Sequence, residues 1–283
     1  MITKDVTKEK LADLEKAYVH FLAKHFGEWE KWAGASQKML DGENVGEEEI
    51  PTDFLLEFKL LRAVLEMEAM GKFDWNNPQL RELFGQLAQS PFYKLWGKTI
   101  TQISLRLAEC VGVKTLVEIG AGRGNLTGIM LQQLADLNLP INLIVTDANP
   151  IVIENMEKLK GNYPQIKIDT LLWDINQAPP QELLEKVKHP CLSYERASIM
   201  YTNIPSIENI ARFSDAVVFG DMFNYTGKLY GYDEISKKIG AYPLFYSEMK
   251  PILDTCFRDH YMFDQRAQEE LNFPNTTMLI GMK

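Results

Sequence analysis

The chain has 283 residues, of which 46% are hydrophobic, enough for one large domain or two modest ones. Its formal net charge is −9 and no basic cluster offsets it, so an extended nucleic-acid-binding surface is disfavoured. Neither a transmembrane span nor an apolar signal-peptide core can be recognised, and the three cysteines are widely separated. We therefore expect a cytoplasmic protein with reduced thiols that has no membrane partner.

The first 108 residues have a helical character. Apolar residues recur every three and four positions from Leu11 to His25, and again in a long helix predicted over residues 52–70. The pairs Asn77-Pro78 and Ser90-Pro91 each predict the start of a further helix. The sequence thus predicts a helical cap domain over residues 1–108 and a second domain over residues 109–283.

A glycine-rich segment, TLVEIGAGRGNL, runs from Thr115 to Leu126. Its apolar half has the composition of a buried parallel strand, and Gly120, Gly122 and Gly124 follow at alternate positions. Glycines permit a sharp turn and a close approach of the backbone to a ligand before a helix begins near Asn125. A GxGxxG dinucleotide site would need glycine at position 125, and no GKS or GKT sequence follows, so pyrophosphate and Walker-type sites are disfavoured.

Two further acidic residues follow apolar runs at regular intervals. LIVTDANP, from Leu143 to Pro150, reads as a strand that ends in Asp147, and IDTLLWDI, from Ile168 to Ile175, reads as a strand that ends in Asp174. The first strand likewise carries an acidic residue, Glu118. Parallel strands joined by helices bring the three acidic residues to one edge of a sheet.

The pattern ExGxGxG from Glu118 to Gly124, together with Asp147 and Asp174, resembles the class I S-adenosylmethionine-dependent methyltransferases. The resemblance implies S-adenosyl-L-methionine as cofactor. In the resembling family the second acid binds both ribose hydroxyls and the third binds the adenine amino group beside a backbone N–H. The cofactor-binding residues that it implies are Glu118, Gly120, Gly122, Gly124, Asp147, Ala148, Asp174, Ile175 and Glu195.

The rest of the chain completes a seven-stranded sheet. We predict strands over residues 191–198 and 215–223, helices over residues 181–188, 206–213 and 232–256, and a terminal antiparallel hairpin. The fold class is α/β, a Rossmann-like seven-stranded methyltransferase sheet with an N-terminal all-helical cap domain. In the resembling family, too, the last strand inserts antiparallel to its neighbours.

Methyl transfer requires mainly that the acceptor atom is aligned with the S–CH3 bond of the cofactor and that a base removes the acceptor's proton. Glu195, Asp221 and His260 are the candidates for catalysis, and Glu195 has an alternative role in holding the methionine amino group. Candidates for the substrate pocket are Tyr93, Arg196, Asn224 and Tyr225. His20 and His25 are five residues apart, which misses the metal-ligand spacing of four, and no metal is predicted.

The sequence limits the chemical class of the methyl acceptor mainly by the motifs that it lacks. No DPPY-like or NPPY-like sequence follows the fourth strand, which disfavours methylation of nucleic-acid bases. The acidic chain, the helical cap and the aromatic residues between positions 194 and 246 favour a closed pocket for a small molecule. O-methylation is the first expectation, and the alternatives are N-methylation, a catalytically silent cofactor-binding scaffold and an NAD-dependent oxidoreductase. The helical region is expected to cover the pocket and select the acceptor, or else to form a homodimer interface.

Overall fold

The computed structural model describes residues 4–25, 29–72, 74, 77–202, 204–221, 223–224, 244–263, 275–276 and 278–283. Their contacts form two compact units. The sheet unit holds the described parts of Met1–Val19, Trp96–Gly227 and Leu244–Lys283, and the helical unit holds the described part of His20–Leu95. The predicted boundary after residue 108 falls inside the sheet unit, within helix α5 (Pro91–Val111), and stays a prediction.

The helical unit is built from amphipathic helices around aromatic residues. Trp32 and Phe54 stack with ring centroids 5.8 Å apart and planes 8° apart, inside a cluster of buried apolar side chains. The predicted helix start at Asn77 is confirmed, because its side chain accepts a hydrogen bond from the Gln79 N–H at 2.8 Å. The elements are α2 (Trp29–Leu40), the 3-10 helices η1 (Glu47–Glu49) and η2 (Thr52–Phe54), α3 (Leu55–Ala69) and α4 (Pro78–Leu87).

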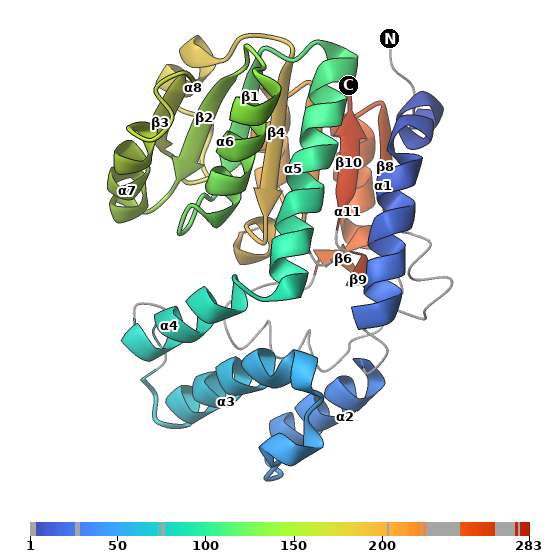
Figure 1. Ribbon diagram of the computed structural model, residues 1–283, viewed down its shortest axis with the longest axis vertical. Helices are drawn as coiled ribbons and strands as arrows, with labels where there is room; N and C mark the ends of the chain where they lie inside the picture. Colours follow the sequence, from blue (N-terminus) through green and yellow to red (C-terminus); the bar gives the residue numbers. More distant parts are fainter. Residues whose placement is uncertain are drawn as a thin grey trace. The chain divides into compact units, whose positions relative to one another are not determined.

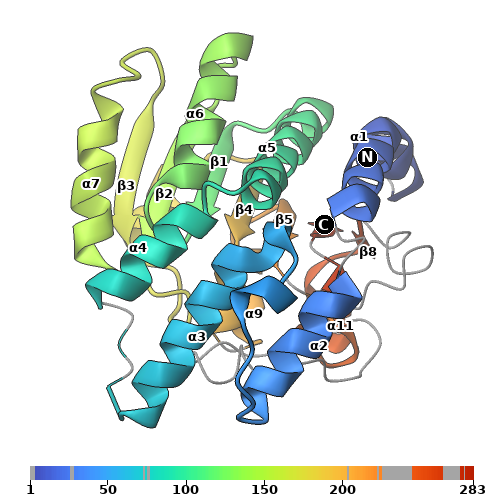
Figure 2. The ribbon, with the colours of Figure 1, turned by 60° about the horizontal axis from the view of Figure 1, so that its bottom comes forward.

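The sheet unit has a seven-stranded sheet in the order β3-β2-β1-β4-β5-β10-β8. Figure 2 shows its first five strands side by side from left to right in this order. Those five are parallel, and β10 pairs antiparallel with both β5 and β8. The predicted seven-stranded sheet, with its antiparallel last strand, is therefore confirmed. Its strands are β1 (Thr115–Ile119), β2 (Asn142–Asp147), β3 (Ile168–Leu172), β4 (Cys191–Arg196), β5 (Ala216–Gly220), β8 (Asp259–Met262) and β10 (Leu279–Met282).

Helices α5 and α6 lie together in front of this sheet (Figure 1). The Gln133 side chain on α6 donates a hydrogen bond to Thr101 Oγ1 on α5 at 2.9 Å. Helix α1 (Lys4–His25) runs beside β8 and β10, where Lys8 Nζ lies 5.2 Å from the centre of the Tyr261 ring. The other helices are α6 (Asn125–Leu137), α7 (Pro150–Lys160), α8 (Gln181–Lys186), η3 (Ile199–Tyr201), α9 (Ser206–Ala211) and α11 (Tyr246–Cys256).

Several details differ from the sequence-based expectation, and the predicted fourth and fifth strands are shorter than expected, ending at Arg196 and Gly220. The third strand ends at Leu172, so Asp174 lies in the turn that follows it. Residues 244–245 form a short strand where a helix was predicted, while residues 232–243 lie outside the described part. A small sheet of β6 (Phe223–Asn224), β7 (Leu244–Phe245) and β9 (Asn275–Thr276) was not predicted, because strands of two residues show no periodicity.

Within the described residues, no helix is both long enough and apolar enough to cross a membrane.

Candidate functional site

The carboxyl ends of β1, β2, β4 and β5 meet at one edge of the sheet. Ile119 at the end of β1 pairs with Thr146 on one side and with Glu195 on the other, and Glu195 pairs in turn with Phe219. The residues that follow, Gly120, Asp147 and Asp221 among them, therefore gather at this edge, where ligands of open α/β sheets bind.

The glycine loop, residues 120–124, turns sharply between β1 and α6. Gly120, Gly122 and Gly124 have φ angles of +64°, +55° and +75°, in the left-handed region that favours glycine. A Cβ atom on Gly120 would lie 2.3 Å from Ser198 Oγ, whereas one on Gly122 would meet nothing within 4 Å. The loop is thus packed closely at Gly120 and open beside Gly122.

Asp147 is held at the tip of β2 by two backbone groups. Its Oδ2 accepts a hydrogen bond from the Gly122 N–H at 2.9 Å, and its Oδ1 accepts one from the Asn149 N–H at 2.8 Å. Each carboxylate oxygen keeps a second lone pair, and the side chain is half-buried. The arrangement orients a carboxylate that can accept two more hydrogen bonds, and the exposed Ala148 follows it.

Asp174 lies in an ordered turn after β3. Its Oδ1 accepts hydrogen bonds from the Asn176 N–H and side-chain amide, both at 3.0 Å, and its side chain is exposed. Ile175 is buried, and its carbonyl oxygen accepts a hydrogen bond from Asn209 Nδ2 at 2.9 Å. The Trp173 N–H donates to the Asp147 carbonyl oxygen at 2.9 Å, which ties this turn to the tip of β2.

Glu118 is almost fully buried within β1. Its Oε1 accepts a hydrogen bond from Thr127 Oγ1 at 2.9 Å, and its Oε2 accepts one from the Tyr194 hydroxyl at 3.0 Å. Burial raises the pKa of this carboxyl group to about 7, against the lowering effect of these two hydrogen bonds and of the Arg196 charge. Glu118 therefore joins β1 to α6 and β4, and its direct contact with a cofactor stays a prediction.

Glu195 and Asp221 are two fully buried carboxyl groups at the ends of β4 and β5. Glu195 Oε2 accepts a hydrogen bond from the Ser198 N–H at 2.7 Å, and Asp221 Oδ2 accepts one from the Met200 N–H at 2.9 Å. Burial, and then the charge of Asp221, raise the pKa of Glu195 well above its usual range. The structure thus brings these two predicted residues together.

Ser198 is a residue of this site that sequence reasoning missed. Its hydroxyl donates hydrogen bonds to the carbonyl oxygens of Ile119 at 3.1 Å and Gly120 at 3.4 Å. In the sequence, Ser198 is 79 residues from Ile119 and 78 residues from Gly120. No local sequence motif predicts this contact, because Ser198 reaches Ile119 and Gly120 only when β1 and β4 pair.

His260 is not brought to this edge. Its strand β8 begins beside the amino end of β5, since Asp259 pairs with Met282, which pairs with Ala216. There His260 Nε2 lies 2.7 Å from Asp254 Oδ1, and its Nδ1 lies 3.3 Å from the Tyr246 hydroxyl. The expectation that His260 reaches the pocket is therefore corrected, because His260 lies near the start of β8, at the edge of the sheet opposite the carboxyl end of β5.

The remaining candidates are Arg196, Tyr93, Asn224 and Tyr225. Arg196 ends β4, and its guanidinium group lies beside Gly97 of α5, where a Cβ atom would be 2.9 Å from Nη1. Tyr93 belongs to the helical unit, where its ring meets that of Phe92 edge-on with centroids 5.5 Å apart. Only the backbone of Asn224 is described, and Tyr225 lies outside the described residues. Their predicted roles at the substrate stay predictions.

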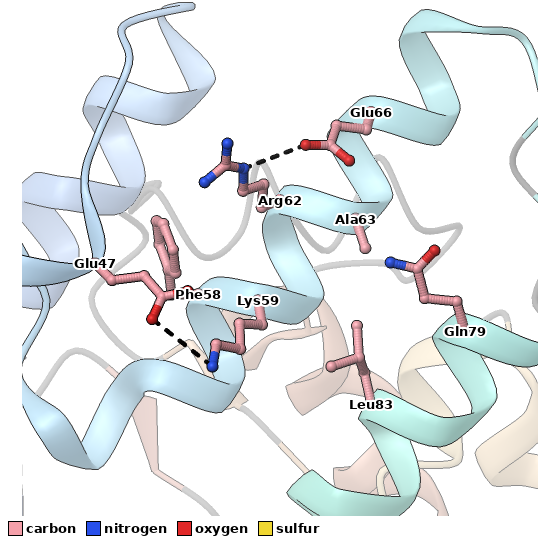
Figure 3. Close-up of a pocket in the computed structure, with 8 residues that line it drawn as sticks. All are labelled: Glu47, Phe58, Lys59, Arg62, Ala63, Glu66, Gln79 and Leu83. Atoms are coloured by element: carbon pink, nitrogen blue, oxygen red, sulfur yellow. Dashed lines mark hydrogen bonds and ion pairs between the residues drawn. The ribbon is translucent and has the colours of Figure 1, made fainter.

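The helical unit has a cavity of about 320 Å³ between α3 and α4 (Figure 3). Lys59 Nζ lies 3.7 Å from Glu47 Oε2, and Arg62 Nε lies 3.2 Å from Glu66 Oε1. Both cations that line it already have carboxylate partners, so it presents no unpaired cation to an anionic ligand. We assign it no function.

Comparison with known proteins finds relatives in sequence and in structure. No protein-family profile matches the chain. It is 26% identical over 145 residues to the non-reducing polyketide synthase sorB of Penicillium rubens, a match that covers 49% of this chain and 5% of that protein. The chain thus spans a small part of the length of this curated relative.

Two solved structures share the architecture. The CMeT domain of the citrinin polyketide synthase is 18% identical with a TM-score of 0.64, over 81% of this chain and 65% of that one. The DszA carbon methyltransferase is 14% identical with a TM-score of 0.66, over 82% of this chain and 66% of that one. The chain therefore has the fold of the class I S-adenosylmethionine-dependent methyltransferases, as the glycine loop and its acids predicted.

Proposed function

We propose that the chain is an S-adenosylmethionine-dependent methyltransferase that methylates a carbon atom of a small-molecule acceptor. The observation that carries the proposal is the gathering of the open glycine loop and two oriented carboxylates, Asp147 and Asp174, at one sheet edge. A nucleoside needs such a set, because its ribose presents two hydroxyl donors and its adenine presents an amino donor.

The residues present fit the cofactor. Asp147 would accept from the ribose hydroxyls with its two remaining lone pairs, and Asp174 would accept from the adenine amino group. The backbone beside Gly122 is open, so the rest of the cofactor would lie there without meeting a side chain at that position. When bound, the cofactor supplies a methyl group made electrophilic by its sulfonium, and the protein has to align the acceptor with it.

Carbon is proposed as the acceptor atom because sorB is a polyketide synthase and DszA is named as a carbon methyltransferase. A carbon between two carbonyl groups must lose a proton before it attacks the methyl group. We propose the Asp221 carboxylate after β5 as the proton acceptor, acting through a water molecule because its side chain is fully buried. Transfer to oxygen, the first expectation from the sequence, and transfer to nitrogen are the alternative outcomes.

The test combines binding with product analysis. Titration calorimetry with S-adenosylhomocysteine and with NAD should show binding of the former only. Transfer of a labelled methyl group should then be followed on a β-dicarbonyl compound, a phenol and an amine, with the methylated atom identified by NMR. Binding of NAD alone would replace the proposal with the oxidoreductase, and binding of S-adenosylhomocysteine without transfer to any acceptor would favour the scaffold.

Asp174→Asn is expected to weaken the preference for adenine over hypoxanthine. An ionised carboxylate accepts from the adenine amino group but repels the carbonyl oxygen of an inosine analogue, whereas an amide can donate to that oxygen. The loss should be about 1.5 to 3 kcal/mol of discrimination, the net worth of one hydrogen bond to a charged group. Calorimetry with S-adenosylhomocysteine and S-inosylhomocysteine measures it, with Asp136→Asn on the exposed face of α6 as the matched control. Equal discrimination in the wild type and Asp174→Asn would place the adenine contact elsewhere.

A further inference from the structure

We propose that Glu195 is kept as a neutral carboxylic acid and that, paired with the Asp221 carboxylate, it positions the segment 197–201 against the glycine loop. Both side chains are fully buried, and both accept a hydrogen bond from the backbone of that segment. The inference concerns the protein alone, and one of its measurements, cofactor affinity, rests on the proposed function.

The sheet register places the two carboxyl groups at the carboxyl ends of neighbouring strands. Glu195 pairs directly with Phe219 on the neighbouring strand, and Asp221 follows Phe219 by two residues. Asp221 directly follows Gly220, the last residue of β5, so the two side chains lie at the carboxyl ends of adjacent parallel strands. The effect of the Asp221 charge on the pKa of Glu195 is consistent with this proximity.

One oxygen of the pair has no hydrogen-bond donor. Glu195 Oε1 is buried and has no partner among the described residues, whereas Oε2 accepts from the Ser198 N–H. A buried carboxylate oxygen without a donor is costly, and a second carboxylate nearby adds repulsion. A proton on Oε1 removes both costs, because the group then becomes a donor and the carboxylate of Asp221 is the neighbouring acceptor.

The groups that act on the pair agree with this charge state. Burial, and then the charge of Asp221, raise the pKa of Glu195, and the weaker effects of the backbone N–H groups of Ser198, Ile199 and Gly220 lower it. Desolvation, followed by the charge of Asp221, also raises the pKa of Tyr201 in η3, whose side chain is still partly exposed, so this phenol stays neutral and adds no second negative charge. The pair therefore carries one negative charge rather than two.

The segment 197–201 connects this pair to the glycine loop. Its backbone is unusual at Ala197, which has a φ of +55° and donates its N–H to the Gly220 carbonyl oxygen at 2.7 Å. At Ser198 the N–H bonds to Glu195 and the hydroxyl bonds to the carbonyl oxygens of Ile119 and Gly120. The position of Ser198, and with it that of the loop at Gly120, thus depends on the protonated Glu195.

Infrared spectroscopy of the whole protein tests the charge state directly. Protein with uniformly ¹³C-labelled glutamate should show an isotope-shifted carbonyl band of a protonated acid at about pH 8, where groups such as Glu118 and Glu57, with pKa values of about 7, are mostly ionised. The band should vanish in Glu195→Gln. A wild-type spectrum without a protonated-glutamate band would overturn the inference, whether or not any variant folds.

Three variants test the positioning role. Glu195→Gln resembles the neutral acid, so its affinity for S-adenosylhomocysteine should stay within about twofold of wild type, while Glu195→Ala, which leaves the Ser198 N–H without its acceptor, should lose about tenfold or more. Glu154→Gln on the exposed face of α7 is the matched control. A loss in Glu195→Gln as large as in Glu195→Ala would show that a charge is needed, and would refute the neutral acid.

The two proposals fail in different ways. If the wild type does not bind S-adenosylhomocysteine, the proposed function fails, and the infrared band together with urea unfolding of the same variants still decides the state of Glu195. If the wild type binds and the protonated band is missing, the proposed function stands and only the neutral acid falls.

Discussion

Replacing Asp147 with alanine is expected to lower the affinity for S-adenosylhomocysteine by about 1.5 to 3 kcal/mol for each charged hydrogen bond lost, or roughly 10-fold to 150-fold for one bond. The carboxylate is held at the tip of β2 by the N–H groups of Gly122 and Asn149, so its free lone pairs are already directed when a ligand arrives. A preorganised acceptor loses little entropy on binding, which is why a large share of the bond energy should appear as affinity. Titration calorimetry on the wild type and the variant measures the loss.

Two controls separate this contact from damage to the loop. Asp136→Ala removes an exposed carboxylate from α6, where it accepts a hydrogen bond from Gln132, and it should leave the affinity unchanged. Asp147→Asn keeps an oxygen that can accept from a backbone N–H but loses the charge, so its affinity should fall between those of the wild type and Asp147→Ala. Equal affinities of wild type and Asp147→Ala would contradict the ribose contact.

The glycine loop and the succession of strands along the chain could be predicted because their signals are local. An apolar run followed by Gly120, Gly122 and Gly124 allows few other conformations, and all three glycines adopt positive φ. The end of the third strand was placed two residues too far, since Leu172 is exposed at the edge of the sheet and apolar periodicity says little there.

The rest of the site depends on contacts between distant segments. A glutamate at the end of a strand reads in sequence as a group offered to a ligand, yet Glu118 and Glu195 are buried once β1 and β4 pair. The same holds for α1: its amphipathic pattern predicts a buried face, but not that Thr7 would lie against Met282, 275 residues away. The acceptor atom is a further example, because the motifs that bind the cofactor carry no information about the atom that receives the methyl group.

Glu118→Gln is expected to remove a large pH dependence of stability. Burial raises the pKa of Glu118 from an ordinary value of 4.5 to about 7, so the folded protein holds this proton more tightly than the unfolded chain does. The stabilisation is therefore fully present below about pH 4.5 and is lost as the pH rises through about 7. A shift of this size corresponds to about 3 kcal/mol. The glutamine has no charge to lose, and it keeps an oxygen that can accept the hydrogen bond from Thr127.

Urea unfolding at about pH 5 and about pH 8 measures the effect as a difference between the two proteins. Glu57 also has a pKa raised to about 7, and burial raises that of Glu195 too, but both groups are present in the wild type and in Glu118→Gln, so their contributions cancel. Relative to the variant, the wild type should lose most of the 3 kcal/mol or so between these two pH values, and Glu154→Gln should follow the wild type. If the free energy of unfolding varied with pH in the same way for the wild type and Glu118→Gln, the Glu118 carboxyl group would ionise in the folded protein without loss of stability. The hydrogen bonds from Thr127 and Tyr194 would then outweigh burial, and Glu118 would be an anion beside the glycine loop at every working pH.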